Sequence, residues 1–184
     1  MTCIAFEEEL NYIRNEEIRN SCIEVLKNVN EEFYHAAASS TGKYHPEYAL
    51  GDGGLYRHTC AAVMIAQCFR DNFTVQDFND ETFDYIISAL ILHDTCKSGR
   101  NWDSKYTKHD HPLQASNLVK EILGECEFSY NVCPLIESHM GQWNICKWDK
   151  TVLPIPATPE QMFVHMCDYL ASRKFIEINF KKGV

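Results

Sequence analysis

Apolar residues recur at helical spacing along most of this chain, with charged and polar residues between them. In the stretch 7–29, apolar side chains return every three or four residues, which predicts an amphipathic helix. The same spacing predicts further helices over 31–38, 55–70, 81–92, 112–123 and 131–139, and a last helix that begins after Thr158. Only the tail 175–180 alternates, weakly, as a short strand or a frayed helix would. The sequence therefore predicts an all-α fold, a helical bundle in a single domain.

Start signals sharpen several of these helices. The segment 158–161, Thr-Pro-Glu-Gln, offers an N-cap, a proline at the first helical position and a glutamine three residues after the cap. Pro112 predicts that a helix begins near His111, and Asp80 is a candidate cap for the helix that follows it. The predicted loops are 39–54, 95–110 and 140–157. The first of them is rich in turn residues and long for a connector, which is typical of a functional loop.

Composition narrows the class of protein. With 184 residues, 45% of them hydrophobic, the chain is long enough for one domain with a sizeable core. A formal net charge of −9 argues against a broad surface for nucleic acid, but it allows a small anionic substrate where a bound metal reverses the local field. The chain contains no apolar run of about 18 residues, so its sequence predicts no membrane span. The acidic start of the chain does not resemble a signal peptide.

The nine cysteines are scattered, and no two of them form a C-x-x-C pair. Most lie inside apolar patterns, where a free thiol behaves as a small hydrophobic residue. This pattern of cysteines predicts that the protein resides in a reducing cytoplasm, and it argues against a zinc site built from thiolates.

The candidate chemistry begins with His93 and Asp94, which follow the apolar run 86–92. An ionised aspartate at the end of a buried element is costly unless a cation or hydrogen-bond donors compensate its charge. A metal ion is one such compensator, because imidazole and carboxylate together suit Mn, Fe, Co, Ni or Zn. The competing interpretation is a helix that simply stops, with a solvated aspartate and a surface Lys97. The rest of the chain favours the metal.

Further metal-capable side chains form an ordered series, each near the end or middle of a separate predicted helix: His58, His111, His139 and Asp168. With His93-Asp94 they make the sequence resemble the HD-domain superfamily of metal-dependent phosphohydrolases, whose signature is a histidine, a later His-Asp pair and a distant aspartate. The matching segments are Arg57-His58-Thr59, Leu92-His93-Asp94-Thr95-Cys96-Lys97 and Cys167-Asp168-Tyr169-Leu170. The upstream segment Thr41-Gly42-Lys43-Tyr44-His45-Pro46 also resembles bacterial and phage members.

The resemblance covers about residues 55 to 173 and implies three parts of the chain. The first is 1–54, N-terminal helices and a loop near the active site that pack on the core. The second is the HD domain itself, 55–173. The third is a C-terminal tail, 174–184.

The resemblance also implies a ligand set. One divalent ion would be bound by His58, His93, Asp94 and Asp168. Members with two ions add two histidines between the His-Asp pair and the last aspartate, where His111 and His139 lie, and Asp94 would then bridge the ions. His109 stays an alternative to His111, although the following Pro112 favours His111. The expected cofactor is therefore one or two ions of Mn, Fe, Co, Ni or Zn.

The implied activity is hydrolysis of a nucleotide or another phosphoester, mono- or diester, by a metal-activated water. Asp94 and Lys97 are the expected catalytic residues, since the three-residue spacing holds Lys97 near the metal, where it would contact phosphate. The expected substrate-binding residues are Lys43, Tyr44, His45, Arg57 and Trp143. Lys43, Arg57 and Arg173 are further candidates for phosphate contacts, and a solvated surface charge is the competing, favoured role for each of them. Trp102, Tyr106 and Trp143 are candidates for an aromatic wall that binds a base or another flat group, and a structural role for them competes equally.

Two other functions remain as alternatives. A di-iron oxygenase with the same fold would use the same six ligands for oxidative cleavage. A non-catalytic ligand-binding domain ranks last, because all four core ligands are present. The expected partner is a small, nucleotide-like phosphorylated substrate, with no membrane and no extensive nucleic-acid binding. The expected location is the cytoplasm of a bacterium, or of the host cell if the chain is phage-encoded.

Overall fold

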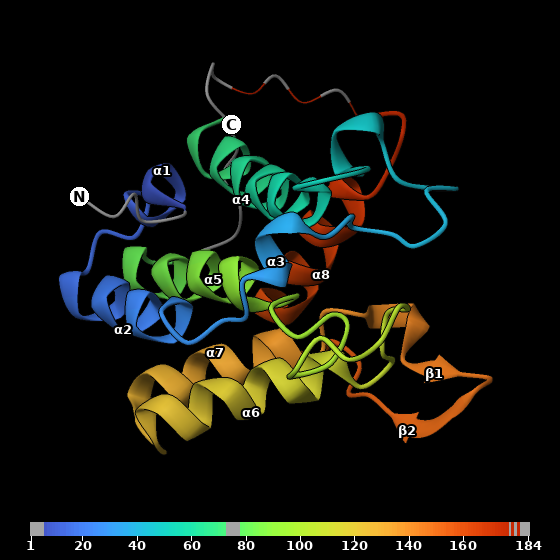
Figure 1. Ribbon diagram of the computed structural model, residues 1–184. Coiled ribbons are helices and arrows are strands. Elements are labelled where there is room, and N and C mark those ends of the chain that lie inside the picture. Colours follow the sequence, from blue (N-terminus) through green and yellow to red (C-terminus); the bar gives the residue numbers. More distant parts are fainter. Residues whose placement is uncertain (1–5, 73–77, 177, 179, 181–184) are drawn as a thin grey trace.

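The structure is a computed structural model, and it describes residues 6–72, 78–176, 178 and 180. In these ranges the fold is almost entirely helical (Figure 1). The helices are α1 (Glu7–Leu10), α2 (Glu16–Leu26), α3 (Glu32–His35), α4 (Gly54–Asn72), α5 (Asp80–Leu92), α6 (His111–Leu123), α7 (Glu127–Glu137) and α8 (Pro159–Ala171). The shorter elements are the 3₁₀ helices η1 (Glu47–Ala49) and η2 (Gly141–Trp143) and the antiparallel strands β1 (Ile145–Cys146) and β2 (Asp149–Val152). The predicted all-α class is confirmed.

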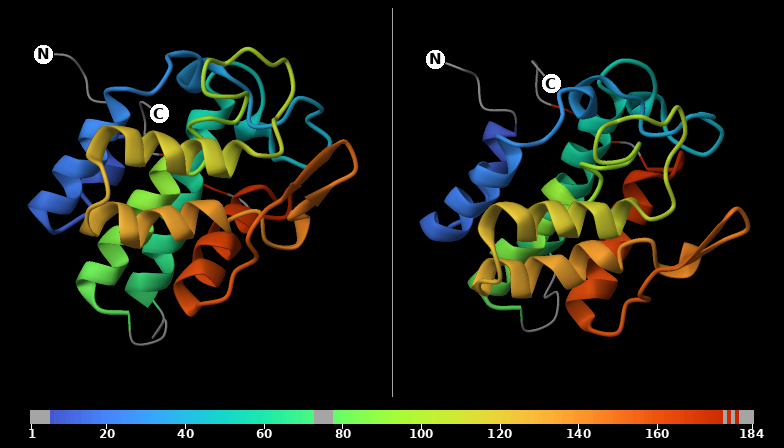
Figure 2. Two further views of the ribbon diagram at one scale, coloured as in Figure 1. Left: turned by 90° about the horizontal axis from the view of Figure 1, so that it is seen from below. Right: turned by 60° about the horizontal axis from the view of Figure 1, so that its bottom comes forward.

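Helix α5 is the centre of the bundle. Its residues from Phe83 to Leu92 are all buried, so this helix is covered on every side rather than amphipathic. Helices α2, α4, α7 and α8 pack against it, and α6 packs along α7 (Figure 1 and Figure 2). The carboxyl end of α5 therefore delivers the residues that follow Leu92 into the middle of the molecule.

The single helix predicted over 7–29 is wrong, because the chain divides there into α1 and α2. Buried Asp84 of α5 accepts hydrogen bonds from the backbone N–H groups of Arg14, at 3.0 Å, and Asn15, at 2.7 Å. The Asn15 side chain in turn accepts from the first N–H groups of α2 and caps it. Side-chain acceptors thus take the backbone groups that a continuous helix would have used.

Two other predicted helices differ in length. Helix α3 ends at His35 rather than 38, because the backbone is extended from Ala36, whose carbonyl accepts a hydrogen bond from Leu55 N–H at 2.8 Å. Helix α7 begins at Glu127 rather than at the predicted residue 131, because Cys126 and Ser129 form a capping box at its start. Both differences lie at helix ends, where local hydrogen bonds decide the boundary.

The predicted cap of α5 is also wrong. The side chain of Asn79, not Asp80, accepts the hydrogen bond from Thr82 N–H, at 2.8 Å. Asp80 is the first helical residue and forms ion pairs with Arg14 and Arg70. The pairs join the ends of α2, α4 and α5 at the surface. The adjacent asparagine had the same capping chemistry, so the sequence pattern alone did not separate the two.

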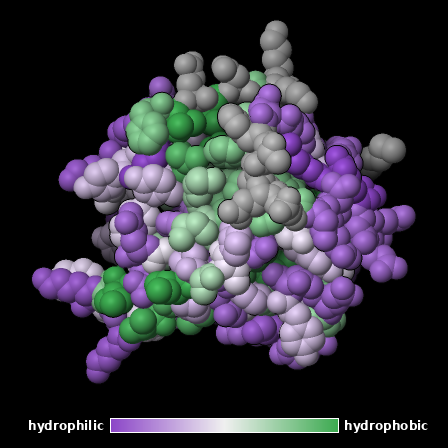
Figure 3. Space-filling view, turned by 180° about the vertical axis from the view of Figure 1, so that it is seen from behind, coloured by the Kyte–Doolittle hydropathy of each residue, from purple (hydrophilic) through white to green (hydrophobic). Residues whose placement is uncertain are grey.

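The predicted loop 140–157 contains the β1–β2 hairpin. Ile145, Trp148 and Val152 on this hairpin are exposed. In the view from behind, apolar side chains gather at the lower left, where the hairpin lies (Figure 3). Strands this short carry too few residues for a periodicity of two to show in the sequence.

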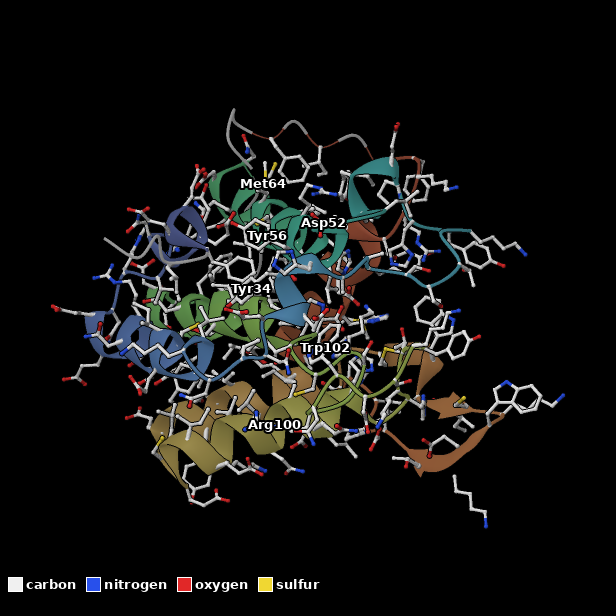
Figure 4. All side chains as sticks on the ribbon, viewed as in Figure 1. Tyr34, Asp52, Tyr56, Met64, Arg100 and Trp102 are labelled. Carbon is white, nitrogen blue, oxygen red and sulfur yellow. The ribbon has the colours of Figure 1, made fainter. Side chains whose placement is uncertain are left out.

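The loops predicted over 39–54 and 95–110 are confirmed, apart from the short η1, and so is the start signal at Thr158. The loop 39–54 is held to α4, because the Arg57 guanidinium donates to the carbonyl oxygens of Tyr48, at 2.7 Å, and Leu50, at 3.0 Å. Tyr34 of α3 and Tyr56 of α4 lie beside each other, with ring centroids 6.4 Å apart (Figure 4). These contacts fix the loop over the amino end of α4.

Several expectations concern the ends and the cysteines. Residues 1–5, and Cys3 with them, lie outside the described residues, as do residues 177, 179 and 181–184 of the tail. The described part of 175–180 forms neither a strand nor a helix. All described cysteines are free thiols. Of the described helices, none combines the length and apolar character that crossing a bilayer requires.

Asp84→Ala should destabilise the protein by about 2–3 kcal/mol, because it leaves two backbone N–H groups unpaired at the junction of α2 and α5. Urea unfolding followed by circular dichroism measures the change. The matched control is Asp71→Ala on the surface of α4, whose side chain accepts only a local hydrogen bond from Gln67. Equal stability of the two variants would contradict a role for Asp84 in separating α1 from α2.

Candidate metal centre

Six histidine and aspartate side chains from five helices meet at the carboxyl end of α5. They are His58 on α4, His93 and Asp94 at the end of α5, His111 at the start of α6, His139 just after α7, and Asp168 on α8. The five residues other than Asp168 are each about 1% exposed or less, while the side chain of Asp168 is 19% exposed. Helices far apart in sequence therefore deliver these groups to one buried place, where Asp168 is the most exposed of the six.

Asp94 lies between two groups of imidazoles. Its Oδ2 atom is 3.3 Å from His93 Nε2 and 3.9 Å from His58 Nε2. Its Oδ1 atom is 3.0 Å from His111 Nε2 and 3.8 Å from His139 Nε2. The two oxygens of one carboxylate thus face two separate ligand groups, the arrangement that a bridging carboxylate requires.

Asp168 completes the first of these groups. Its Oδ1 atom lies 2.9 Å from His58 Nε2 and 3.5 Å from His93 Nε2. The two groups together contain all six predicted ligands, four around Asp94 Oδ2 and three around Asp94 Oδ1, with Asp94 shared. His111 belongs to the cluster and His109 does not, because His109 Nε2 is hydrogen-bonded to the carbonyl of Asn144 at 3.2 Å.

Three of the histidines are oriented by the same device. In His93, His111 and His139, the Nδ1 atom is hydrogen-bonded to the backbone carbonyl three residues earlier, at 2.6 to 2.7 Å. A carbonyl oxygen can only accept, so Nδ1 carries a proton in each of them and Nε2 is the nitrogen that faces the cluster and can bind a cation once it is unprotonated. Such hydrogen bonds from the far nitrogen are usual for histidines that bind metals.

The buried polar atoms of the cluster fit a cation. Within the described part of the chain, His93 Nε2 and Asp94 Oδ1 are buried and have no hydrogen-bond partner. His111 Nε2 lies close to Asp94 Oδ1 but is not aligned for a hydrogen bond. Unpartnered buried groups of this kind are costly, and a metal ion would satisfy them. Three overlapping groups of residues could hold an ion, because the ligand atoms within each group all lie within 4.8 Å of one another. The groups are His58–His93–Asp94, His93–His139–Asp168 and Asp94–His111–His139.

The charges around Asp94 shift the ionisation of the cluster. Burial alone would raise the pKa of Asp94, but the Lys97 ammonium and His93 hold that pKa well below its usual range. The Lys97 Nζ atom lies 2.5 Å from Asp94 Oδ2. Burial opposes protonation of His93 as well, yet the carboxylates of Asp94 and Asp168 raise the pKa of His93 to about 10. Burial and the neighbouring imidazoles of His93 and His111 lower the pKa of His139 to about 3, so His139 is neutral at pH 7.

A cavity of about 230 Å³ opens onto the cluster. Its lining includes the metal-capable Asp168 and His111, together with Lys97, His45 and Trp143. A second hollow of about 140 Å³ shares Lys97 with the first and is lined by Trp102 and Lys105. A larger hollow of about 340 Å³ lies elsewhere, among Glu81, Glu127 and Glu160 of α5, α7 and α8. Its acidic lining disfavours phosphate, so its size does not make it the better candidate site.

The loops place some of the predicted substrate-binding residues at the cavity. His45 lies beside His58, with ring centroids 5.7 Å apart. The loop 39–54 thus folds over the cluster. Burial, His58 and Lys97 lower the pKa of His45 to about 4, so His45 is neutral at pH 7. The loop 95–110 folds back on itself through a hydrogen bond from Lys108 N–H to the Lys97 carbonyl, at 2.9 Å, which positions Lys97.

Three other predicted substrate-binding residues do not line this cavity. Lys43 and Tyr44 are exposed and contact each other, with Nζ 5.1 Å from the ring centroid. Arg57 holds the carbonyl groups of the loop 39–54 instead. Tyr106, a predicted part of the aromatic wall, is exposed in the loop 95–110. All of these residues are close in sequence to predicted ligands, but the fold decides which of their side chains face the cavity.

Two residues near the site were not predicted from the sequence as parts of it. Tyr169 lines the cavity and stacks on Trp143, although 26 positions separate them in the chain. The His165 Nδ1 atom is hydrogen-bonded to the His139 carbonyl at 2.7 Å, and the His165 ring packs where a side chain at Gly141 would lie. His165 therefore supports the turn that carries His139. The only sequence signal was its position one turn before Asp168.

Comparisons with known proteins agree with this geometry. The sequence model of the HD domain matches residues 55–173, and the chain belongs to the HD domain family. The chain is also similar to dihydroneopterin 2′,3′-cyclic phosphate phosphodiesterase from Methanocaldococcus jannaschii, with 27% identity over 175 residues. That alignment covers 88% of this chain but only 65% of the relative, so the chain spans just under two thirds of its length. No solved structure matches.

Metal binding should release protons at neutral pH. A pKa of about 10 leaves His93 protonated at pH 7, so its Nε2 atom must lose that proton before it can bind a cation. Affinity for Mn²⁺ should therefore rise with pH between about 6 and 8, by up to about tenfold per unit for each proton released. Calorimetric titration of Mn²⁺ in buffers of different ionisation enthalpy counts the protons. An affinity that does not change with pH would contradict a protonated His93.

Proposed function

We propose that this chain is a metal-dependent phosphohydrolase that acts on a small phosphoester, with a nucleotide-like compound as the preferred class. One observation carries the proposal: the two carboxylate oxygens of Asp94 face two separate groups of imidazoles beside an open cavity. This is the donor set of a two-ion centre that does not use thiolates. The HD domain family and the similar phosphodiesterase support the same reaction class.

Each side chain has a role in this proposal. His58, His93, Asp94 and Asp168 would hold one divalent ion, and His111 and His139 would hold a second together with Asp94. Bound ions would supply a water of lowered pKa and stabilise charge on the phosphoryl oxygens. The carbonyl-bound Nδ1 atoms keep the imidazoles aimed at the centre, which limits the reorganisation needed during a reaction.

Lys97 and His45 would contact the phosphoester. The Lys97 ammonium lines the cavity and lies against Asp94 Oδ2, so a phosphoryl oxygen could accept a hydrogen bond from it next to the ligands. His45 is neutral at pH 7 and its buried Nδ1 atom has no hydrogen-bond partner within the described residues. It could donate to or accept from a substrate oxygen. With Trp143, these residues make up our proposed substrate contacts.

The proposal also covers which metal is bound and where the protein resides. Imidazole and carboxylate ligands suit Mn, Fe, Co, Ni or Zn. A di-iron oxygenase would use the same ligands, and activity without oxygen separates it from a hydrolase. The free thiols of the described cysteines support a reducing cytoplasm as the location.

Asp94→Ala should abolish both metal binding and hydrolysis, with a loss of at least about 1,000-fold in kcat/KM for bis(p-nitrophenyl) phosphate, since Asp94 serves both ligand groups. Metal analysis by mass spectrometry and an anaerobic Mn²⁺-dependent assay measure the two effects. Asp71→Ala is the matched control, because Asp71 is an exposed residue of α4 that accepts a local hydrogen bond from Gln67. Full activity of Asp94→Ala would remove the central assignment.

His139→Ala should lower the bound metal from about two ions per chain to about one, because His139 belongs to the group around Asp94 Oδ1. The measurement is metal content after dialysis against a trace of Mn²⁺. His109→Ala is the control, since its ring is turned to the Asn144 carbonyl, and it should retain both ions. An unchanged metal count in His139→Ala would leave only a single-ion centre.

A further inference from the structure

A pair of aromatic rings forms one wall of the cavity beside the metal centre. Trp143 of η2 and Tyr169 of α8 are stacked, with ring planes 19° apart and centroids 5.6 Å apart. The Arg173 guanidinium carbon lies 4.5 Å from the Tyr169 centroid and 6.0 Å from the Trp143 centroid. The Arg173 guanidinium is therefore close to both rings of the pair. All three side chains line the cavity.

The rings are held in place before any ligand arrives. The His165 ring packs near Trp143, at 6.1 Å between centroids, and is itself hydrogen-bonded to the His139 carbonyl. The Arg173 guanidinium donates to Ser172 Oγ at 2.8 and 3.0 Å. Trp143 nevertheless remains 42% exposed. An ordered indole that is left partly open to a cavity is a preformed surface for a flat ligand, because little side-chain entropy is lost on binding.

The wall lies within reach of the proposed phosphate site. Tyr169 directly follows the ligand Asp168 on α8, and both residues line the cavity. Lys97 and His111 line the same cavity, whose volume is about 230 Å³. A phosphoryl group at Lys97 and a ring on Trp143 would therefore share this one cavity.

We propose that Trp143, Tyr169 and Arg173 form a ring-binding subsite, so that the substrate is a phosphoester of a nucleoside-like compound with a flat aromatic heterocycle. This inference rests on the proposed function. The stacked rings offer an aromatic face to the heterocycle, and Arg173 offers a cation that favours ring nitrogens and carbonyl oxygens. The subsite discriminates between phosphoesters with a ring and those without one.

The test compares two five-membered cyclic phosphodiesters. Adenosine 2′,3′-cyclic phosphate carries an aromatic heterocycle, and glycerol 1,2-cyclic phosphate does not. In the Mn²⁺-loaded protein, Trp143→Ala should lower kcat/KM for the adenosine ester by roughly 10- to 100-fold and leave the glycerol ester within about twofold. Trp143→Phe should retain most of the discrimination. The matched control is Trp148→Ala, since Trp148 is 85% exposed and does not line the cavity. It should change neither rate.

Equal losses of kcat/KM on both esters in Trp143→Ala would show that Trp143 only supports the fold. No loss on either ester would show that the heterocycle binds elsewhere. Each of these results overturns the subsite. If the wild-type protein hydrolyses neither ester, the hydrolase proposal fails for diesters, and calorimetric binding of adenosine 3′-monophosphate and glycerol 2-phosphate decides the subsite. Weaker binding of the adenosine compound alone to Trp143→Ala supports it. Equal affinity of the wild-type protein for both compounds overturns it.

Discussion

The buried carboxylate of Asp94 is the constraint on which the rest of the structure depends. It is 1% exposed at the end of a helix that is itself covered on every side. A charge in that position is stable only where other groups compensate it, because water cannot. Lys97 and the surrounding imidazoles provide this compensation, and they hold the pKa of Asp94 well below its usual range. The ends of α4, α6, α7 and α8 therefore converge on the end of α5.

The fold divides the work between helices and loops. The histidines and aspartates lie on or beside helices, and backbone carbonyls three residues earlier fix three of the imidazole rings. Rigid elements of this kind give a metal centre its precision. The residues proposed to contact substrate lie mostly elsewhere: His45 and Lys97 on loops, and Trp143 on η2. Loops can vary without disturbing the cluster, so the proposed metal centre would be compatible with different phosphoesters.

The sequence predicted the class of fold and the six side chains of the cluster, because helical periodicity and the His-Asp motif are local signals. It failed where a distant side chain decides the outcome. Asp84 divides the predicted helix over 7–29 from across the bundle, and Arg57 turns to the carbonyl groups of a loop rather than to the cavity. The pairing of Trp143 with Tyr169 was also outside its reach, since no local pattern links residues on η2 and α8.

Anomalous diffraction from crystals grown with Mn²⁺ tests the central claim most directly, because it locates the ions without reference to activity. We expect two anomalous peaks on opposite sides of the Asp94 carboxylate, one among His58, His93 and Asp168 and the other between His111 and His139. Occupied peaks elsewhere on the molecule, with neither Asp94 oxygen bound to a metal, would contradict it.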